Sequence, residues 1–213
     1  LPELSKTITE LACVFGKQVR LEMPDADIRW EVGQWQAFRE LLLPLLRFIF
    51  QMGIETTEER WVRGKSGAAL LRLEATLAGG QCLFRIGYEG RLLSSELVHR
   101  TLLARQWCTP EMIGRLPDQA LLDFVFHPDF FASTEPGNAA GQAIDLSIVR
   151  QGVQRMGGTV QLSPTTALPG MLFELRIPFR LSPSRSLWVE IAGGHLPLAL
   201  PWVREILDAS STE

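Results

Sequence analysis

The charged segment 55–65 contains the residues whose types and spacing come closest to a phosphate-binding motif. It reads ETTEERWVRGK and is followed by Ser66. A Gly-Lys-Ser sequence can end a phosphate-binding P-loop, but that motif needs a second glycine five positions before Gly64, where Glu59 stands. The sequence therefore predicts no P-loop, and the segment has to be interpreted together with its neighbours.

The histidines and cysteines do not form a metal-binding pattern. The chain has three of each, far apart and without a Cys-x-x-Cys pair: His99, His127, His195, Cys13, Cys82 and Cys108. We expect no metal site. Scattered cysteines favour a reducing compartment, so we expect a cytoplasmic protein. The net charge of −3 gives no broad attraction to nucleic acid, and no apolar run is long enough for membrane insertion.

A long apolar segment directly before the charged one must position it. Residues 35–52 are apolar on every side of a 3.6-residue period, which predicts a helix that is buried all round. Pro44 lies inside this segment and removes one backbone donor, so we expect a kink or a restart of the helix there. We expect Gly53 to cap the helix C-terminus, after which Ile54 re-enters the core.

The rest of the chain alternates helical and strand patterns. Apolar spacing predicts helices at 4–15, 94–107 and 150–156, and shorter helices that open at 110 and 117. Alternating or short apolar runs predict strands at 19–23, 28–30, 68–77, 81–88, 160–162, 172–179, 187–191 and 196–200. Gly79-Gly80 and Gly193-Gly194 predict turns between neighbouring strands.

The stretch 41–65 resembles the first nucleotide-binding motif of chemotaxis-type histidine kinases, the CheA family. In that family a buried helix reads H-L-x-R-N-x-x-D-H-G-I-E and is followed by E-x-R and G-K. The matching residues are Arg47, Gly53, Ile54, Glu55, Glu59, Arg60, Gly64 and Lys65. The resemblance places Phe48 at the Mg²⁺-binding Asn of the family and Gln51 at its Asp, so the frame of the motif is kept and its reactive positions are not.

Three later stretches resemble the same family in the same order. Glu89 and Gly90 stand where the family has D-D-G-x-G, whose second Asp accepts a hydrogen bond from adenine. Residues 126–130, FHPDF, match the family's F-H-P-G-F. Residues 140–149 stand in the place of S-G-R-G-V-G-M-D-V-V, in which only Gly141 keeps a glycine and Ala143 and Asp145 replace the other two.

Asp145 admits two interpretations. A carboxylate near the phosphate position costs about 4 kcal/mol of repulsion for one like-charge pair at about 4 Å, so it disfavours ATP. Alternatively, Asp145 or Ser147 caps the following helix. Glu89 is the best candidate for a surviving adenine contact, and an exposed loop carboxylate is its alternative.

The resemblance implies an α/β sandwich of the GHKL (Bergerat) ATPase type, with a mixed β-sheet and helices layered on one face. Residues 1–182 are expected to form a degenerate histidine-kinase-like ATPase domain, and residues 183–213 to begin a CheW-like regulatory β domain or to form a linker. Large pilus-motility kinases of the PilL or ChpA type share this order. Because Leu1 opens within a helical pattern, we expect a piece of a longer protein.

The altered pocket residues favour a degenerate kinase domain without cofactor or catalytic residues. Such a domain would act as a scaffold in chemosensory two-component signalling, with a CheW-like adaptor, a response regulator and a receptor array as partners. The alternative is an active histidine kinase domain that binds ATP and Mg²⁺ through altered contacts. A GHKL ATPase of the gyrase, MutL or Hsp90 type is less favoured. The apolar residues of 187–202 predict pairing between copies of the chain.

Overall fold

The computed structural model describes most of the chain in two units, Leu1–Phe179 and Arg180–Glu213. The described residues are 2–24, 32–131, 144–178, 186–191 and 194–199. The strand predicted at 28–30 lies outside them, as do Gly141 and Ala143. Each unit is described by itself.

The first unit is built on a five-stranded sheet with the order β1-β2-β3-β5-β4. Its strands are β1 (Val19–Glu22), β2 (Ala69–Ala78), β3 (Gln81–Glu89), β4 (Thr159–Thr165) and β5 (Gly170–Pro178). The pairing of β1 with β2 is parallel and the other pairings are antiparallel. Gly79 and Gly80 join β2 to β3 with φ values of 58° and 71°, as a two-residue hairpin turn requires.

Strand alternation gives the sheet one apolar and one charged face. On the apolar face, Leu71 and Leu73 of β2 stand opposite Tyr88 and Ile86 of β3, and all four are buried. Ion pairs lie on the other face, where Arg72 Nη2 is 2.7 Å from Glu22 Oε2. A similar pair joins β3 and β5, with Arg85 Nε 3.0 Å from Glu174 Oε2. Only the apolar face therefore needs a covering layer.

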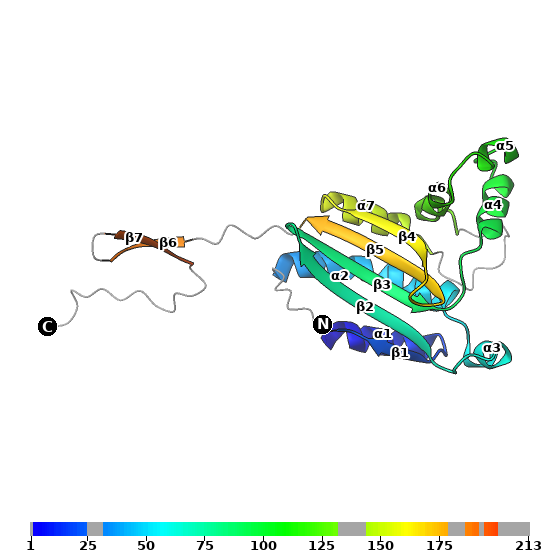
Figure 1. The fold of residues 1–213 in the computed structure, drawn as a ribbon, viewed down its shortest axis with the longest axis horizontal. Coiled ribbons are helices and arrows are strands. Elements are labelled where there is room, and N and C mark those ends of the chain that lie inside the picture. Colours follow the sequence, from blue (N-terminus) through cyan, green and yellow to red (C-terminus); the bar gives the residue numbers. More distant parts are fainter. Residues whose placement is uncertain (1, 25–31, 132–143, 179–185, 192–193, 200–213) are drawn as a thin grey trace. The chain divides into compact units, whose positions relative to one another are not determined.

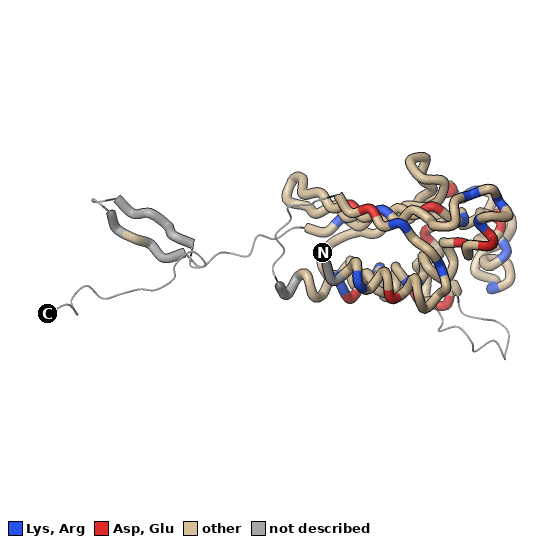
Figure 2. The backbone as a smooth tube through the Cα atoms, turned by 90° about the horizontal axis from the view of Figure 1, so that it is seen from below, with Lys and Arg blue, Asp and Glu red and all other residues tan. Residues whose placement is uncertain are grey.

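Three helices cover that face: α1 (Pro2–Val14), α2 (Val32–Phe48) and α7 (Ser147–Arg155) (Figures 1 and 2). Gly152 of α7 lies against Leu41 of α2, so close that a Cβ there would be 2.2 Å from Leu41 Cδ2. Of the shorter helices, α3 (Thr57–Val62), α4 (Ser95–Ala104) and α5 (Pro110–Ile113) lie toward one end of the sheet (Figure 1). Helix α6 (Asp118–Asp123) and the 3₁₀ turn η2 (Phe124–Phe126) follow them along the chain. The predicted mixed sheet with helices on one face is confirmed.

The restart predicted at Pro44 is wrong. Helix α2 continues through Pro44 to Phe48 and then widens into a π-helix, η1 (Ile49–Gly53), in which Ile54 N donates to Ile49 O at 2.8 Å. The carbonyl that Pro44 leaves without a donor belongs to Glu40, an exposed residue, so water can satisfy it.

Gly53 is not the C-cap residue that was predicted. Ile54 is the cap residue of η1, in an extended conformation, and Gly53 is needed for space instead. A Cβ on Gly53 would lie 2.5 Å from the ring of Tyr88. The glycine therefore lets the end of η1 pack directly on β3.

The second unit contains a hairpin of β6 (Ser186–Ile191) and β7 (Gly194–Ala199). The strands are antiparallel, with Ile191 opposite Gly194 and Trp188 opposite Pro197. Among the described residues of the whole chain, no helix is both long enough and apolar enough to cross a membrane.

Candidate functional site: a buried charge network at the end of the sheet

Helix α3 begins with a reciprocal cap. Glu59 N donates to Thr56 Oγ1 at 3.2 Å, and Thr56 N donates to Glu59 Oε2 at 3.0 Å. Sequence analysis treated this segment as a polar tail and missed the helix. The signal was present, because a threonine followed three residues later by a glutamate is the pattern of a capping box.

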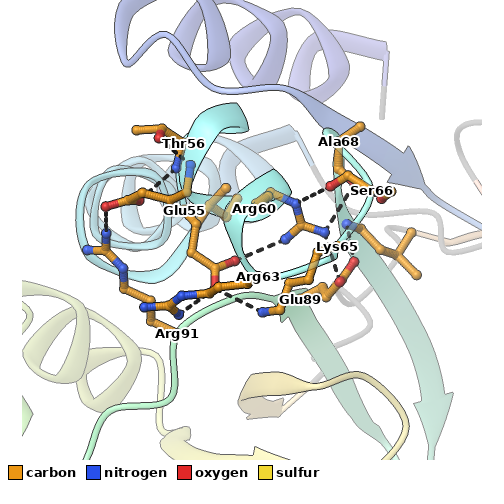
Figure 3. A network of polar contacts seen from close by, with 12 residues as sticks. Glu55, Thr56, Arg60, Arg63, Lys65, Ser66, Ala68, Glu89 and Arg91 are labelled. Atoms are coloured by element: carbon orange, nitrogen blue, oxygen red, sulfur yellow. Dashed lines mark hydrogen bonds and ion pairs between the residues drawn. The ribbon is translucent and has the colours of Figure 1, made fainter.

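Arg60 of α3 is completely buried and binds four acceptors (Figure 3). Its Nε donates to Ser66 O at 2.6 Å, and its Nη2 donates to Ala68 O at 3.3 Å. Its Nη1 donates to Glu55 Oε2 at 3.1 Å, and Nη2 also donates to Glu89 Oε1 at 2.8 Å. One guanidinium thus joins α3, the loop before β2 and the end of β3.

Glu55 is the buried anion at the centre of this network. Arg63 Nη1 and Lys65 Nζ both donate to its Oε1 at 2.9 Å, while Arg60 occupies its other oxygen. Burial alone would raise the pKa of Glu55. The hydrogen bond from Lys65 and the charges of Lys65, Arg60 and Arg63 outweigh burial, so the pKa is lowered. Glu55 is therefore ionised at neutral pH.

Glu89, the predicted adenine acceptor, lies in the network with both oxygens in use. Oε1 accepts from Arg60 and Oε2 accepts from Leu70 N at 3.3 Å. The next residue, Gly90, packs closely against Gly53, because a Cβ on Gly90 would lie only 2.3 Å from Gly53 O. Arg91 N donates to the same carbonyl at 2.7 Å. Glu89 and Gly90 thus connect the end of β3 to α3 and η1.

Lys17, which follows α1, adds a cation that sequence analysis did not single out. Its Nζ donates to Ile54 O at 2.6 Å and to Phe50 O, at the open carbonyl end of η1. Burial, followed by the nearby positive charge of Arg91, lowers the pKa of Lys17. Lysine at a helix C-terminus interacts favourably with the helix dipole.

Phe48 is a core residue in this structure. It is 1% exposed, and its ring centroid lies 5.3 Å from that of Phe131 and 5.6 Å from that of Phe173. Gln51 is half-buried in η1 on the following turn. Phe48 does not belong to the charge network, whereas the backbone O of Gln51 lies 3.5 Å from Lys17 Nζ.

Asp145 lies one residue before Leu146, the N-cap residue of helix α7, which itself has no side-chain cap hydrogen bond. Asp145 Oδ1 accepts from the N–H of Ser147, the first residue of the helix, at 2.8 Å, so its carboxylate satisfies a backbone donor at this helix end without being the N-cap. Gly141 and Ala143, the other two predicted residues of this stretch, lie outside the described residues. No group of three or more potential metal ligands occurs in the part of the chain that the structure describes.

No protein-family model matches the chain. It is 22% identical to the chemotaxis protein CheA of Rhizobium meliloti, over 98% of this chain and 27% of that protein. It is 24% identical to the chemotaxis protein CheA of Listeria monocytogenes, over 95% of this chain and 32% of that protein. It is 22% identical to a gliding motility regulatory protein of Myxococcus xanthus, over 87% of this chain and 24% of that protein.

Among solved structures, the catalytic domain of the histidine kinase ThkA aligns with a TM-score of 0.47 and 17% identity, over 82% of this chain and 91% of that one. The blue-light activated histidine kinase of Erythrobacter litoralis aligns with a TM-score of 0.46 and 13% identity, over 83% of this chain and 40% of that one. The chain spans about a quarter to a third of the length of the curated relatives. Over that span the chain is homologous to chemotaxis CheA proteins.

Proposed function

We propose that this chain is a CheA-like catalytic domain that does not bind Mg-ATP productively and acts as an interaction module in chemosensory signalling. The observation that carries the proposal is the packing of Phe48. Its ring is buried between Phe131 and Phe173, at the position where the family resemblance places the Mg²⁺-binding Asn.

An apolar ring at this position removes the chemistry of the site. Mg²⁺ requires oxygen ligands in octahedral geometry, and a phenyl ring provides none. Catalysis of phosphoryl transfer depends mainly on positioning and charge neutralisation, so loss of the metal site removes most of it. The residues present therefore do not fit a Mg-nucleotide.

The contacts of Glu89 support the same proposal. Arg60 Nη2 and Leu70 N each donate to one oxygen of Glu89, so the orientation of the carboxylate is fixed, and a base would have to approach the remaining lone pairs or weaken one of these bonds. Arg60 is fully buried, and removing one partner from a buried ion pair costs about 3–5 kcal/mol. A base that displaced Arg60 would therefore lose part of its binding energy to this cost.

The proposed partners follow from the homology to chemotaxis proteins. They are a CheW-like adaptor, a response regulator and the receptor array, with the chain serving as a folded scaffold between them. A role in pilus-based motility extends this proposal, and it is supported by the similarity to a gliding motility regulatory protein.

Isothermal titration calorimetry tests the proposal directly. Titrations of the chain with Mg-ATP, Mg-ADP and metal-free ATP should show no saturable heat at millimolar nucleotide. The catalytic domain of a CheA relative in the same buffer is the positive control. Saturable binding of Mg-ATP would overturn the proposal in favour of an active kinase domain with altered contacts.

A further inference from the structure

A cavity of about 420 Å³ lies between helix α7 and the α6–η2 segment and shares no lining residue with the charge network. One wall is formed by Arg150, Gln151 and Gln154, which lie at positions i, i+1 and i+4 on one side of α7. The other wall includes Phe124 and Phe126. The cavity is within the range of about 300–1,000 Å³ that small-molecule sites occupy, and it combines aromatic walls with a few polar groups in the same way.

Arg150 is the charged group of this cavity, and the Phe126 ring helps to fix its position. Its Cζ lies 4.6 Å from the centroid of the Phe126 ring, which is buried. Its Nη2 is also 3.2 Å from Asp123 Oδ1, but the two side chains are 31% and 45% exposed. Exposed ion pairs contribute little to stability. Another carboxylate could therefore replace Asp123 while the guanidinium stays on the ring.

His127 gives the cavity a second polar group with a fixed orientation. Its Nδ1 lies 2.6 Å from Pro128 O, and because a carbonyl can only accept, Nδ1 is the donor. The ring centroid is 4.2 Å from that of Trp107, which restricts rotation. The remaining ring nitrogen and the amides of Gln151 and Gln154 can bond the polar atoms of a ligand.

We propose that this cavity binds a carboxylate attached to an aromatic body, with the carboxylate taking the place of Asp123 on Arg150. The aromatic part would lie against Phe124, and the glutamine amides would bond the neighbouring polar atoms. A free aromatic acid and the C-terminal residue of a peptide both have this chemistry, so the experiment must distinguish them.

A titration followed by ¹⁵N NMR tests the site with N-acetyl-tryptophan as the probe. Saturable shifts should occur at the backbone amides of residues 120–127 and 147–154. N-acetyl-tryptophanamide, which lacks the carboxylate, should bind at least about tenfold more weakly. A tripeptide ending in tryptophan separates the two sources. Tighter binding than the free acid indicates a peptide ligand, and equal or weaker binding indicates a small acid. Equal binding of acid and amide, or no shifts at these residues, would overturn the proposal.

Three variants make the test specific for the carboxylate. Arg150→Gln should weaken the probe by about tenfold or more, since it removes a charged hydrogen bond. Asp123→Asn should strengthen it by up to about fivefold, because the competing carboxylate is gone. Arg155→Gln lies on the same helix but outside the cavity lining, and it should leave the affinity unchanged. If Arg150→Gln does not fold, Arg150→Lys replaces it in the test, because lysine keeps the positive charge but lacks the planar guanidinium. Unchanged affinity in Arg150→Gln or weaker binding in Asp123→Asn contradicts the proposal.

Discussion

Arg60 is a buried cation whose guanidinium has four acceptors, and these acceptors compensate for its loss of contact with water. It neutralises Glu55 and Glu89 and satisfies two loop carbonyls, so each charge of the network has a counter-charge. Breaking a buried pair leaves the remaining charges in a medium where they are poorly solvated. Glu89 therefore depends on Arg60 for its counter-charge, whereas Glu55 is also bound by Arg63 and Lys65.

The first prediction is that Arg60→Met lowers the free energy of unfolding by about 3–5 kcal/mol, because Glu55 and Glu89 lose their buried partner. Urea unfolding followed by circular dichroism measures this change. Arg63→Met is the matched control, since the Arg63 side chain is 55% exposed and also pairs with Glu55. Its loss should be about 1 kcal/mol or less. Equal losses of unfolding free energy in the two variants would contradict a larger contribution from the buried arginine.

The second prediction is that Phe48→Asn does not restore binding of Mg-ATP. In this variant Glu89 still binds Arg60, so the substitution at Phe48 does not change the environment of the residue that replaces the family's adenine acceptor. The variant should also lose about 3–5 kcal/mol of stability, since a buried aromatic is removed. Thermal shift with and without Mg-ATP measures both effects. A ligand present at one hundred times its Kd stabilises by about 2.7 kcal/mol, so a rise of several degrees in Tm would show that Phe48 was the main barrier.

The third prediction concerns acid. The pKa of Glu55 is lowered from its ordinary value of 4.5. Its ionised form therefore stabilises the fold fully above that value, and the stabilisation is lost as pH falls through the lower pKa of the folded state. We expect the free energy of unfolding to fall from pH 5 downward in wild type. Glu55→Gln should be less stable at pH 7 and should show a smaller fall, and an unchanged slope would exclude Glu55 as a contributor.

At the scale of elements, the contact between η1 and β3 depends on the absence of two side chains. Gly53 leaves room for the Tyr88 ring, and Gly90 lets the end of β3 reach the last carbonyl of the π-helix. Burial raises the pKa of Tyr88, so its hydroxyl stays neutral in this contact. The contact between the π-helix and the sheet is therefore too close to accommodate a side chain at either glycine.

The fourth prediction is that Gly90→Ala destabilises the domain by about 1–3 kcal/mol, the usual effect of overpacking. The new Cβ would lie 2.3 Å from Gly53 O and would strain the bond from Arg91 N. Gly114→Ala is the control, because its nearest neighbour would be 3.6 Å away and its φ is −65°. That variant should be neutral or slightly stabilising. Thermal unfolding compares the two, and equal Tm values would contradict the close contact.

The elements that were predictable from sequence are those with a strong local signal. Strands β2 and β3 follow a two-residue alternation and are joined by two glycines, and both fall within one or two residues of the prediction. Helix α2 was predictable from its apolar residues, but its course at Pro44 was not, since that depends on the solvent exposure of Glu40.

The charge network was less predictable because its partners are distant in sequence. Glu89 is 29 residues from Arg60, and Lys17 is 37 residues from Ile54. Family resemblance pointed to the matching residues of segment 55–65 but not to the contacts that join them. Contact positions beyond the motif residues were not predictable either, and Leu92, two residues after Gly90, is an example. Leu92 is 59% exposed, because it follows the β3 end in a surface loop.

At the scale of the whole molecule, the β6–β7 hairpin has two strands and two edges. A two-stranded hairpin is marginally stable alone, and an open edge can pair with another strand. The fifth prediction is that copies of the chain associate through this hairpin. Light scattering at increasing concentration should show a mass above that of one chain, and deleting residues 184–213 should return the monomer mass. A monomeric full chain at high concentration would contradict this prediction.

Proline in β7 makes the two edges of that hairpin chemically unequal. Opposing residues of an antiparallel pair alternate between exchanging hydrogen bonds and directing their backbone groups outward. The strands are separated by two residues, so Ile191 and Gly194 form a hydrogen-bonded pair and Trp188 and Pro197, three positions along, form an outward-directed pair. Pro197 has no N–H to offer there, whereas Trp188 has one. A strand added by another polypeptide should therefore grow on the β6 side, which gives association a direction and limits it to one added strand per hairpin.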